Sequence, residues 1–183
     1  MGIGGYEIRN PNEIHFITFA VVEWVDVFTR SCYSDLVVES LIFCKKHKGL
    51  KIYAWVIMSN HLHLIVSATE GAHLSDILRD FKKFTSKPII KAIQENHRES
   101  RREWMLDIFK SQGRQNARNV FNQFWRQTNH PIELRSKRMK YQRLDYLHNN
   151  PVKAGIVTSP EYYKYSSAVS YISKGGLLDV EFL

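Results

Sequence analysis

Residues 55–66 read WVIMSNHLHLIV, the pattern of a strand, a two-residue turn and a returning strand. Side chains two residues apart on a strand point to the same face. His61 and His63 are therefore expected on one face of the returning strand, and three apolar side chains on the other: Leu62, Leu64 and Val66. Two imidazoles side by side on a rigid strand can form half of a metal site. An isolated pair of this kind is also typical of a protein surface, so a metal site requires further ligands from elsewhere in the chain.

The neighbouring segments extend this hairpin into a sheet. Residues 50–58 alternate, which predicts one shared face for Leu50, Ile52, Ala54, Val56 and Met58. Residues 13–27 are rich in β-branched and aromatic side chains and predict a buried central strand. Residues 131–135 predict a short edge strand, because Pro131 cannot donate to a ladder.

Helical spacing predicts helices between these strands. The first covers residues 32–48, with Ser31 as its cap and Gly49 as its stop. The second helix has an apolar stripe made of Leu74, Ile77, Leu78, Phe81 and Phe84. Pro88 either kinks this helix or opens a further one. Ser136 can cap a third helix that ends near Asn149, and residues 162–171 are expected to form one more short helix. The resulting order predicts an α+β fold of the ferredoxin-like split β-α-β kind, with a central antiparallel sheet and an added C-terminal helix.

Composition limits the class of protein. The 183 residues suit one domain, and a net charge of +8 favours polyanionic partners such as nucleic acid, although a generic basic surface has the same composition. The chain has no long apolar run and no secretory signal, so we expect a cytoplasmic protein without a membrane span. Within the single domain of residues 1–183, the polar stretch of about 96–121 is expected to be a loosely packed insertion with one short helix.

A second stretch, LDYLHNNP at residues 144–151, supplies further polar groups. Tyr146 and Asn150 are four residues apart on the predicted helix, so both can approach one site. The opposite side of that helix is expected to face the core through Tyr141, Leu144 and Leu147. Taken alone, a helical tyrosine is usually a packing residue, and Asn-Asn-Pro is usually a helix stop.

The strings AWVIMSNHLHLIV (residues 54–66) and LDYLHNNPVKAGIV (residues 144–157) together resemble the HUH-type single-tyrosine transposase family. More narrowly they are similar to its REP-associated tyrosine transposase-like branch, and the resemblance covers about residues 13–157. It implies the HUH nuclease fold with the tyrosine on the C-terminal helix. It also implies Tyr146 as the nucleophile, and His61, His63 and Asn150 as ligands of a divalent metal, Mg²⁺ or Mn²⁺.

This resemblance implies a bacterial mobile-element enzyme that cleaves and rejoins single DNA strands at hairpin-associated sites. Attack by the tyrosine would give a 5′-phosphotyrosine intermediate. The implied partner is single-stranded or hairpin DNA, and relatives act as a homodimer or as a monomer. Two alternatives stay open: a domesticated protein that binds DNA hairpins with little or no turnover, and a metal-dependent nuclease that uses water.

Several cations and aromatic residues are candidate DNA contacts. The side chains expected to follow phosphates are Arg79, Lys82, Lys83, Arg126 and Lys153. Those expected to stack on bases are Tyr53, Trp55 and Trp125. Each is also consistent with a solvated charge or a core aromatic residue.

Overall fold

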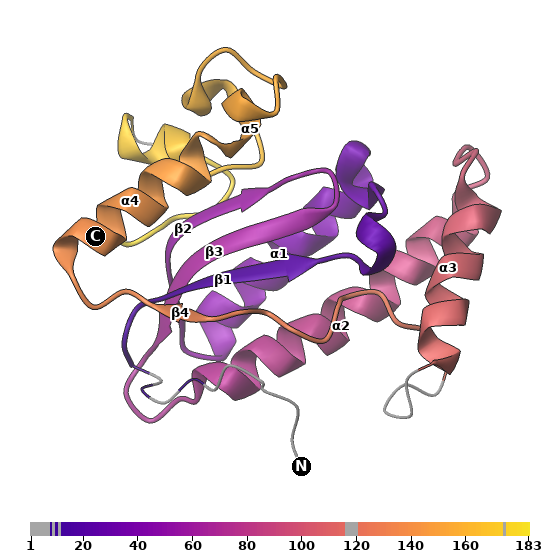
Figure 1. The fold of residues 1–183 in the computed structure, drawn as a ribbon, viewed down its shortest axis with the longest axis horizontal. Helices are drawn as coiled ribbons and strands as arrows, with labels where there is room; N and C mark the ends of the chain where they lie inside the picture. Colours follow the sequence, from indigo (N-terminus) through magenta and orange to yellow (C-terminus); the bar gives the residue numbers. More distant parts are fainter. Residues whose placement is uncertain (1–7, 9, 11, 116–120, 174) are drawn as a thin grey trace.

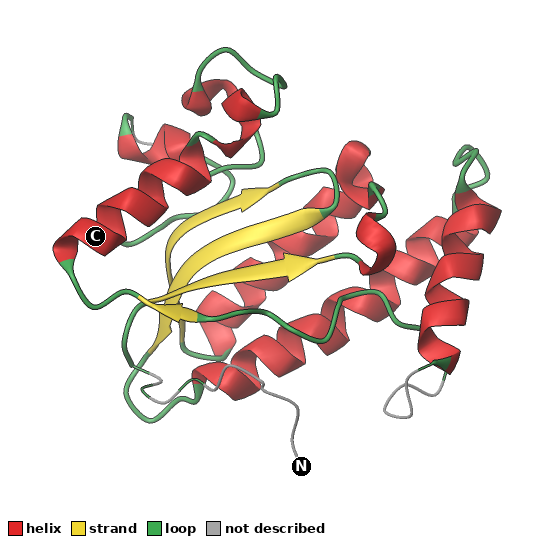
Figure 2. Cartoon of the chain, in the orientation of Figure 1, coloured by secondary structure: helices red, strands yellow, loops and turns green. Residues whose placement is uncertain are grey.

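A four-stranded antiparallel sheet forms the centre of the computed structural model, which describes residues 8, 10, 12–115, 121–173 and 175–183 (Figure 2). The strand order is β2-β3-β1-β4, where the strands are β1 (His15–Ala20), β2 (Leu50–Ile57), β3 (His61–Ala68) and β4 (Ile132–Glu133). A helix follows β1 and another follows β3, which is the ferredoxin-like arrangement. The predicted fold class is therefore confirmed, with β4 as the short edge strand.

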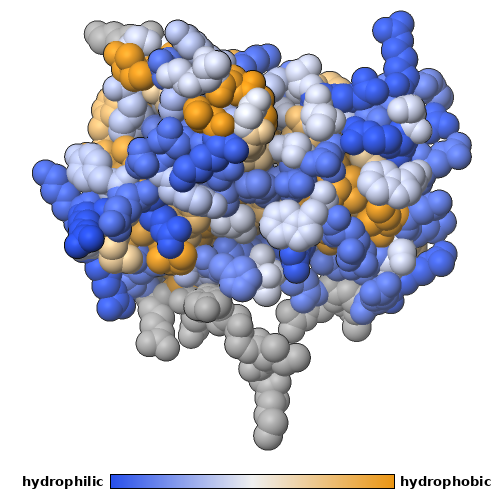
Figure 3. Space-filling model, turned by 45° about the horizontal axis from the view of Figure 1, so that its top comes forward, coloured by the Kyte–Doolittle hydropathy of each residue, from blue (hydrophilic) through white to orange (hydrophobic). Residues whose placement is uncertain are grey.

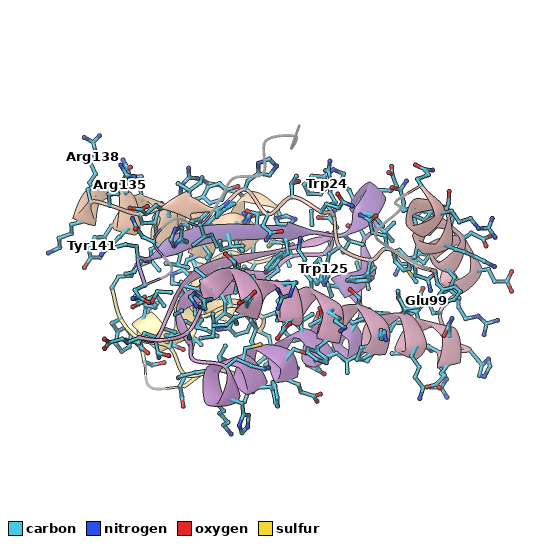
Figure 4. The ribbon with its side chains drawn as sticks, turned by 90° about the horizontal axis from the view of Figure 1, so that it is seen from below. Trp24, Glu99, Trp125, Arg135, Arg138 and Tyr141 are labelled. Atoms are coloured by element: carbon cyan, nitrogen blue, oxygen red, sulfur yellow. The ribbon has the colours of Figure 1, made fainter. Side chains whose placement is uncertain are left out.

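Helices cover the two faces of the sheet unequally. Helices α1 (Ser31–His47) and α2 (Leu74–Glu95) pack on each other behind the sheet in Figure 1. Helix α4 (Lys137–His148) contacts β2 and β3 from the opposite face and leads into the short α5 (Asn150–Lys153). In Figure 4, α4 lies over one end of the sheet and α3 (Arg102–Arg114) lies beyond the other end. Part of one sheet face is consequently left without a helix over it. No helix in the described ranges is long and apolar enough to cross a membrane.

Strand β1 ends at Ala20, well before the predicted residue 27. Its side chains are buried on both faces: Phe19 belongs to the larger core beneath α1 and α2, and Phe16 belongs to the smaller core beneath α4. Beyond Ala20 the backbone turns, because Glu23 and Trp24 adopt φ angles of 51° and 54°. A strand cannot continue through such left-handed residues.

Strand β2 contains a β-bulge that the alternating sequence does not reveal. Ile52 pairs with Val66, but Ala54 pairs with Ile65, so β2 holds one extra residue there. The bulge exchanges the two faces of the strand. Leu50 and Ile52 lie in the larger core, whereas the other members of the predicted face lie in the smaller one: Ala54, Val56 and Met58. The prediction of a single shared face was wrong for this reason.

Helix α2 runs through Pro88 as one element of 22 residues. Phe84 is 56% exposed, so it was wrongly included in the apolar stripe. The following segment is anchored rather than loose: the Glu99 carboxylate has no exposed side-chain surface and accepts hydrogen bonds from Arg30 and Arg101. Helix α3 also buries Met105 and Phe109. Residues 116–120 of the predicted insertion lie outside the described ranges.

The chain after α5 forms short 3₁₀ turns instead of the helix predicted for residues 162–171. The reason is that its backbone extends the outer edge of β2. The Ile57 N–H donates to the Tyr165 carbonyl at 2.9 Å, and the Ser167 N–H donates to the Trp55 carbonyl at 2.9 Å. Tyr141 was also misplaced by the sequence pattern: it is 46% exposed on α4, whereas Leu144 and Leu147 are buried as predicted.

Candidate active site

Tyr146 on α4 and the histidines of β3 meet on one face of the sheet. Leu144 and Leu147 bury one side of α4 in the smaller core, which brings the Tyr146 ring 5.5 Å from the ring of His63. The rings of His61 and His63 are 4.7 Å apart. Tyr146 remains 38% exposed, so its hydroxyl-bearing ring is accessible. The two sequence motifs thus come together within a single chain.

His63 is buried, with one ring nitrogen bonded and the other unpaired. Its Nδ1 lies 2.9 Å from the Thr18 hydroxyl on the adjacent strand β1. Its Nε2 is buried without a hydrogen-bond partner among the described residues. An unpaired buried polar atom is costly unless a ligand satisfies it. With the proton on Nδ1, Nε2 carries the lone pair that a metal ligand needs.

Asn60 fixes the tautomer of His61. The Asn60 amide nitrogen donates to the Trp24 carbonyl at 3.2 Å and to the Asp26 carboxylate at 3.1 Å, so the amide oxygen faces His61. His61 Nδ1 lies 2.7 Å from that oxygen. Because an amide oxygen can only accept, Nδ1 must donate, which leaves the lone pair on Nε2.

The turn that precedes His61 is itself fixed by the backbone of the segment after β1. The Val21 N–H donates to the Asn60 carbonyl at 2.9 Å, and the Phe28 N–H donates to the Ser59 carbonyl at 2.8 Å. The Ser59-Asn60 turn, predicted from sequence, therefore has contacts on both its backbone and its side chain.

Both imidazoles are held neutral. Burial, with the nearby His61 and Arg143, lowers the pKa of His63 to about 3. Burial also lowers the pKa of His61, and the Asp26 carboxylate opposes this only in part. Neutral imidazole is the form that binds metal ions.

Asn150 opens α5, directly after the helix that carries Tyr146. It is half-buried, and its side chain makes no hydrogen bond within the described part of the chain. No measured distance joins it to the histidines, so its place as a third ligand stays a prediction. The described residues hold no cluster of three or more His, Cys, Asp or Glu side chains. The donor set available at this site is thus two imidazoles with an amide, which suits a divalent ion that keeps other positions open.

Two cations that flank Tyr146 complete the site. The Lys153 ammonium lies 5.5 Å from the centre of the Tyr146 ring, and the Arg143 guanidinium lies 5.9 Å from it. Arg143 also lies 5.0 Å from the Phe16 ring. The sequence motifs do not single out Arg143; its position three residues before Tyr146 on a helix is the signal that could have found it.

His148 is close to Tyr146 in sequence but faces elsewhere. Its Nε2 is 2.9 Å from the Ser167 hydroxyl, and its ring lies against Tyr171. Burial lowers the pKa of His148 to about 4. This contact joins α4 to the segment that covers β2, so His148 has a structural position.

A family model described as "Transposase IS200 like" matches residues 12–112, more than half of the chain. The chain belongs to the IS200-like transposase family. The matched range contains His61 and His63 and ends before Tyr146 and Asn150. The transposase identity predicted from the two motifs is confirmed.

Two solved structures are similar to this transposase, and the first of them shows the same fold. One is described as the structure of a REP-associated tyrosine transposase bound to a REP hairpin; it has a TM-score of 0.67 and 17% identity, and the match covers 98% of this chain and 96% of that one. Another is a putative transposase from Deinococcus radiodurans R1, with a TM-score of 0.45, 15% identity, and coverage of 81% of this chain and 97% of that one. No curated protein matches the chain. The first likeness agrees with the fold expected for the REP-associated branch.

The predicted phosphate-contacting cations of this transposase differ in their surroundings. Lys153 is beside Tyr146, and Arg126 is exposed with its guanidinium 5.3 Å from the Trp24 ring. Arg79 is exposed but paired with Asp76, and Lys83 lies over Phe84 on the exposed side of α2.

The Lys82 ammonium makes its hydrogen bonds within the protein. Its ammonium donates to the Arg126 carbonyl at 2.7 Å, to the Gln127 carbonyl at 3.0 Å, and to the Asn129 side chain. Burial lowers the pKa of Lys82 to about 8. These contacts give Lys82 a role in holding the loop and do not support a phosphate contact.

The aromatic residues expected to stack on bases are mostly buried. Trp55 is 0% exposed and Trp125 is 4% exposed, so neither presents a face to DNA. Tyr53 is half-buried and bonded to the Ser67 hydroxyl. Trp24, which the sequence pattern placed inside a strand, is 50% exposed and lies 6.0 Å from the ring of His61.

Proposed function

We propose that this transposase cleaves and rejoins single DNA strands through covalent attack by Tyr146 at a divalent-metal site. The supporting observation is the 5.5 Å approach of the Tyr146 ring to His63, whose Nε2 is buried and unpaired. A packing tyrosine would not need an unsatisfied ligand nitrogen beside it. The likeness in fold to a transposase bound to a REP hairpin agrees with this proposal.

His61, His63 and Asn150 would hold the ion, Mg²⁺ or Mn²⁺. When bound there, it would polarise the scissile phosphate and offset the negative charge that builds up in the transition state. The protein's part is to present two neutral Nε2 atoms, which Asn60 and Thr18 orient through Nδ1.

Tyr146 supplies the nucleophilic oxygen. The tyrosine oxygen forms a bond to phosphorus while the bond from phosphorus to the 3′ oxygen breaks, and the leaving strand takes up a proton as its 3′-hydroxyl. The tyrosine loses its own proton in this step. The 5′-phosphotyrosine then conserves the bond, so attack by another 3′-hydroxyl joins a new strand and releases Tyr146. No nucleotide triphosphate is consumed.

Arg143 and Lys153 are placed to draw the phosphate towards Tyr146. Both cations lie within 6 Å of the tyrosine ring, on α4 and α5 respectively. A cation beside a reacting phosphate stabilises its growing negative charge. The net charge of +8 adds a general attraction for DNA, and hydrophilic residues dominate the face shown in Figure 3.

Hairpin DNA is the proposed substrate, with single-stranded DNA at its foot as the segment that is cut. In Figure 4, α4 lies over one end of the sheet and α3 lies beyond the other, and we propose that this strand runs between them. Of the candidate phosphate contacts, Arg126 lies beside Trp24 and Lys153 lies beside Tyr146.

The test is covalent adduct formation. Wild-type protein, Mn²⁺ and a hairpin flanked by single-stranded DNA should give a protein–nucleotide adduct that mass spectrometry assigns to Tyr146. Tyr146→Phe should give none, whereas Tyr141→Phe, which changes another exposed tyrosine of the same helix, should behave as wild type. Undiminished cleavage by Tyr146→Phe would point to the water-dependent nuclease. Binding without any adduct under every metal would point to the domesticated binding protein.

A further inference from the structure

A hollow of about 330 Å³ lies beside the candidate active site, at the end of the sheet that faces α3. Its lining comes from three separate segments and includes Glu23, Trp24, Gln112, Arg126, Gln127 and Thr128. The volume falls within the range of about 300–1,000 Å³ that is usual for pockets that hold small ligands. Trp24 belongs to the 3₁₀ turn Val22–Trp24 that follows β1, and Figure 4 shows it on the side of the molecule towards α3.

Trp24 gives this hollow an aromatic surface that continues the row of rings in the active site. The Trp24 ring is 6.0 Å from His61, His61 is 4.7 Å from His63, and His63 is 5.5 Å from Tyr146. A DNA strand whose phosphate lies at Tyr146 and His63 would therefore reach the hollow within a short distance along its backbone.

The backbone at Trp24 is held in a costly conformation. Glu23 and Trp24 both have positive φ angles, 51° and 54°, which are uncommon for residues with large side chains. Backbone strain of this kind is concentrated at ligand sites. The Asn60 side chain, which also orients His61, donates to the Trp24 backbone carbonyl and so fixes the backbone that carries the indole.

The chemistry of the lining suits a nucleobase better than a phosphate. The Glu23 carboxylate in the lining would repel an anion that enters the hollow. Amide, hydroxyl and carboxylate groups are the side chains that bind base edges. Gln127 and Thr128 supply an amide and a hydroxyl that make no side-chain hydrogen bond within the described ranges.

We infer that the Trp24 hollow binds one unpaired nucleobase that adjoins the scissile phosphate, by stacking on the indole. This inference rests on the proposed function, because it places the DNA strand across the row from Tyr146 to Trp24. It adds a subsite that can recognise a base without pairing to it.

Equilibrium binding without metal tests the subsite separately from catalysis. The probes are a fluorescein-labelled single-stranded 12-mer of mixed sequence and a 12-mer with the same backbone whose nucleotides are all abasic. Trp24→Ala should weaken binding of the base-containing 12-mer by about 5- to 150-fold, the usual effect of removing one stacking platform. It should leave binding of the abasic 12-mer unchanged, and Trp24→Phe should restore most of the lost affinity.

Trp104→Ala is the matched control, since Trp104 is 54% exposed and does not line the hollow. It should bind both probes as wild type does. Equal affinities of wild type and Trp24→Ala for the base-containing probe would overturn the inference, as would an equal loss for both probes. Failure of adduct formation at Tyr146 with retained base-dependent binding would overturn only the proposed catalysis.

A second measurement needs no variant. Irradiation of wild-type protein with a 12-mer that contains 5-bromodeoxyuridine should crosslink a base to the peptide that carries Trp24. Crosslinks confined to other peptides would contradict the inference, even if the alanine variant does not fold.

Discussion

Thr18→Val removes the hydroxyl partner of His63 and leaves the shape of the side chain almost unchanged. The lost interaction is the 2.9 Å contact with Nδ1 of a histidine that is 5% exposed. Removing the partner that orients a metal-binding histidine typically lowers metal affinity by about 10- to 100-fold. The free energy of unfolding without metal should also fall by about 1–3 kcal/mol, because a buried nitrogen is left unpaired. For a chain of this length that corresponds to a fall of about 2–12 °C in Tm.

The assay is calorimetric titration of Mn²⁺ into the protein, with a thermal melt of the metal-free form. Thr158→Val makes the same chemical change at an exposed position after α5 and should alter neither result. A lower Tm for Thr18→Val combined with wild-type Mn²⁺ affinity would refute the assignment of His63 as a ligand. Wild-type values in both measurements would show that the hydroxyl contact contributes nothing.

Three further changes probe the scaffold. Glu99→Gln should lower the free energy of unfolding at pH 7 by about 1.5–3 kcal/mol through its hydrogen bonds to two arginines. Burial alone would raise the pKa of Glu99, but the hydrogen bonds from the arginines lower it overall. The stability that Glu99 contributes is therefore fully present above the pKa of the unfolded state, and it is lost as pH falls through the pKa of the folded state. Gly49 and Gly71 have similar φ angles, +74° and +80°, so alanine brings similar backbone strain at both positions. Gly49→Ala should nevertheless lower the free energy of unfolding more than Gly71→Ala, because only the Cβ added at position 49 meets Thr69. The pKa of Lys82 in the folded protein is about 8, so between about pH 8 and 10 the unfolded chain binds more protons than the folded one. The free energy of unfolding should therefore rise with pH over this range, and Lys82→Met should abolish that rise.

Urea unfolding at several pH values checks all three. A Glu99→Gln protein as stable as wild type at pH 7 would contradict a stabilising role for the buried carboxylate. Equal losses for the two glycine variants would mean that the contact with Thr69 is relieved at no cost. An unchanged pH profile after the lysine substitution would show that Lys82 titrates as a solvated group.

Local signals predicted the histidine strand and the tyrosine helix correctly. Leu62 and Leu64 alternate strictly with His61 and His63, so the two faces of β3 can be assigned from the sequence. The Ser136 hydroxyl accepts from the Met139 N–H, which is the capping contact expected from its position. In both segments the deciding interactions lie within a few residues of each other.

Other features depend on partners that are distant in sequence. The bulge between Ile52 and Ala54 is hidden because β2 is apolar on both faces, so either register looks buried. The turn at Trp24 is held by Asn60, which lies 36 residues further along the chain. Nothing in the apolar sequence around Trp24 indicates that this side chain is exposed. Lys82 resembles any surface cation until the loop 44 and 45 residues later folds over it.

The backbone contacts of the Ser59-Asn60 turn also give the site an intrinsic reporter. The amides of Val21 and Phe28 donate to this turn, so their protons exchange with solvent only when the turn and the segment after β1 separate. Because the same turn positions His61, slow deuterium uptake at these two amides would measure how firmly the site is organised before DNA arrives. Exchange that slows further when Mn²⁺ is added would show that order at the histidines extends into the segment that carries Trp24.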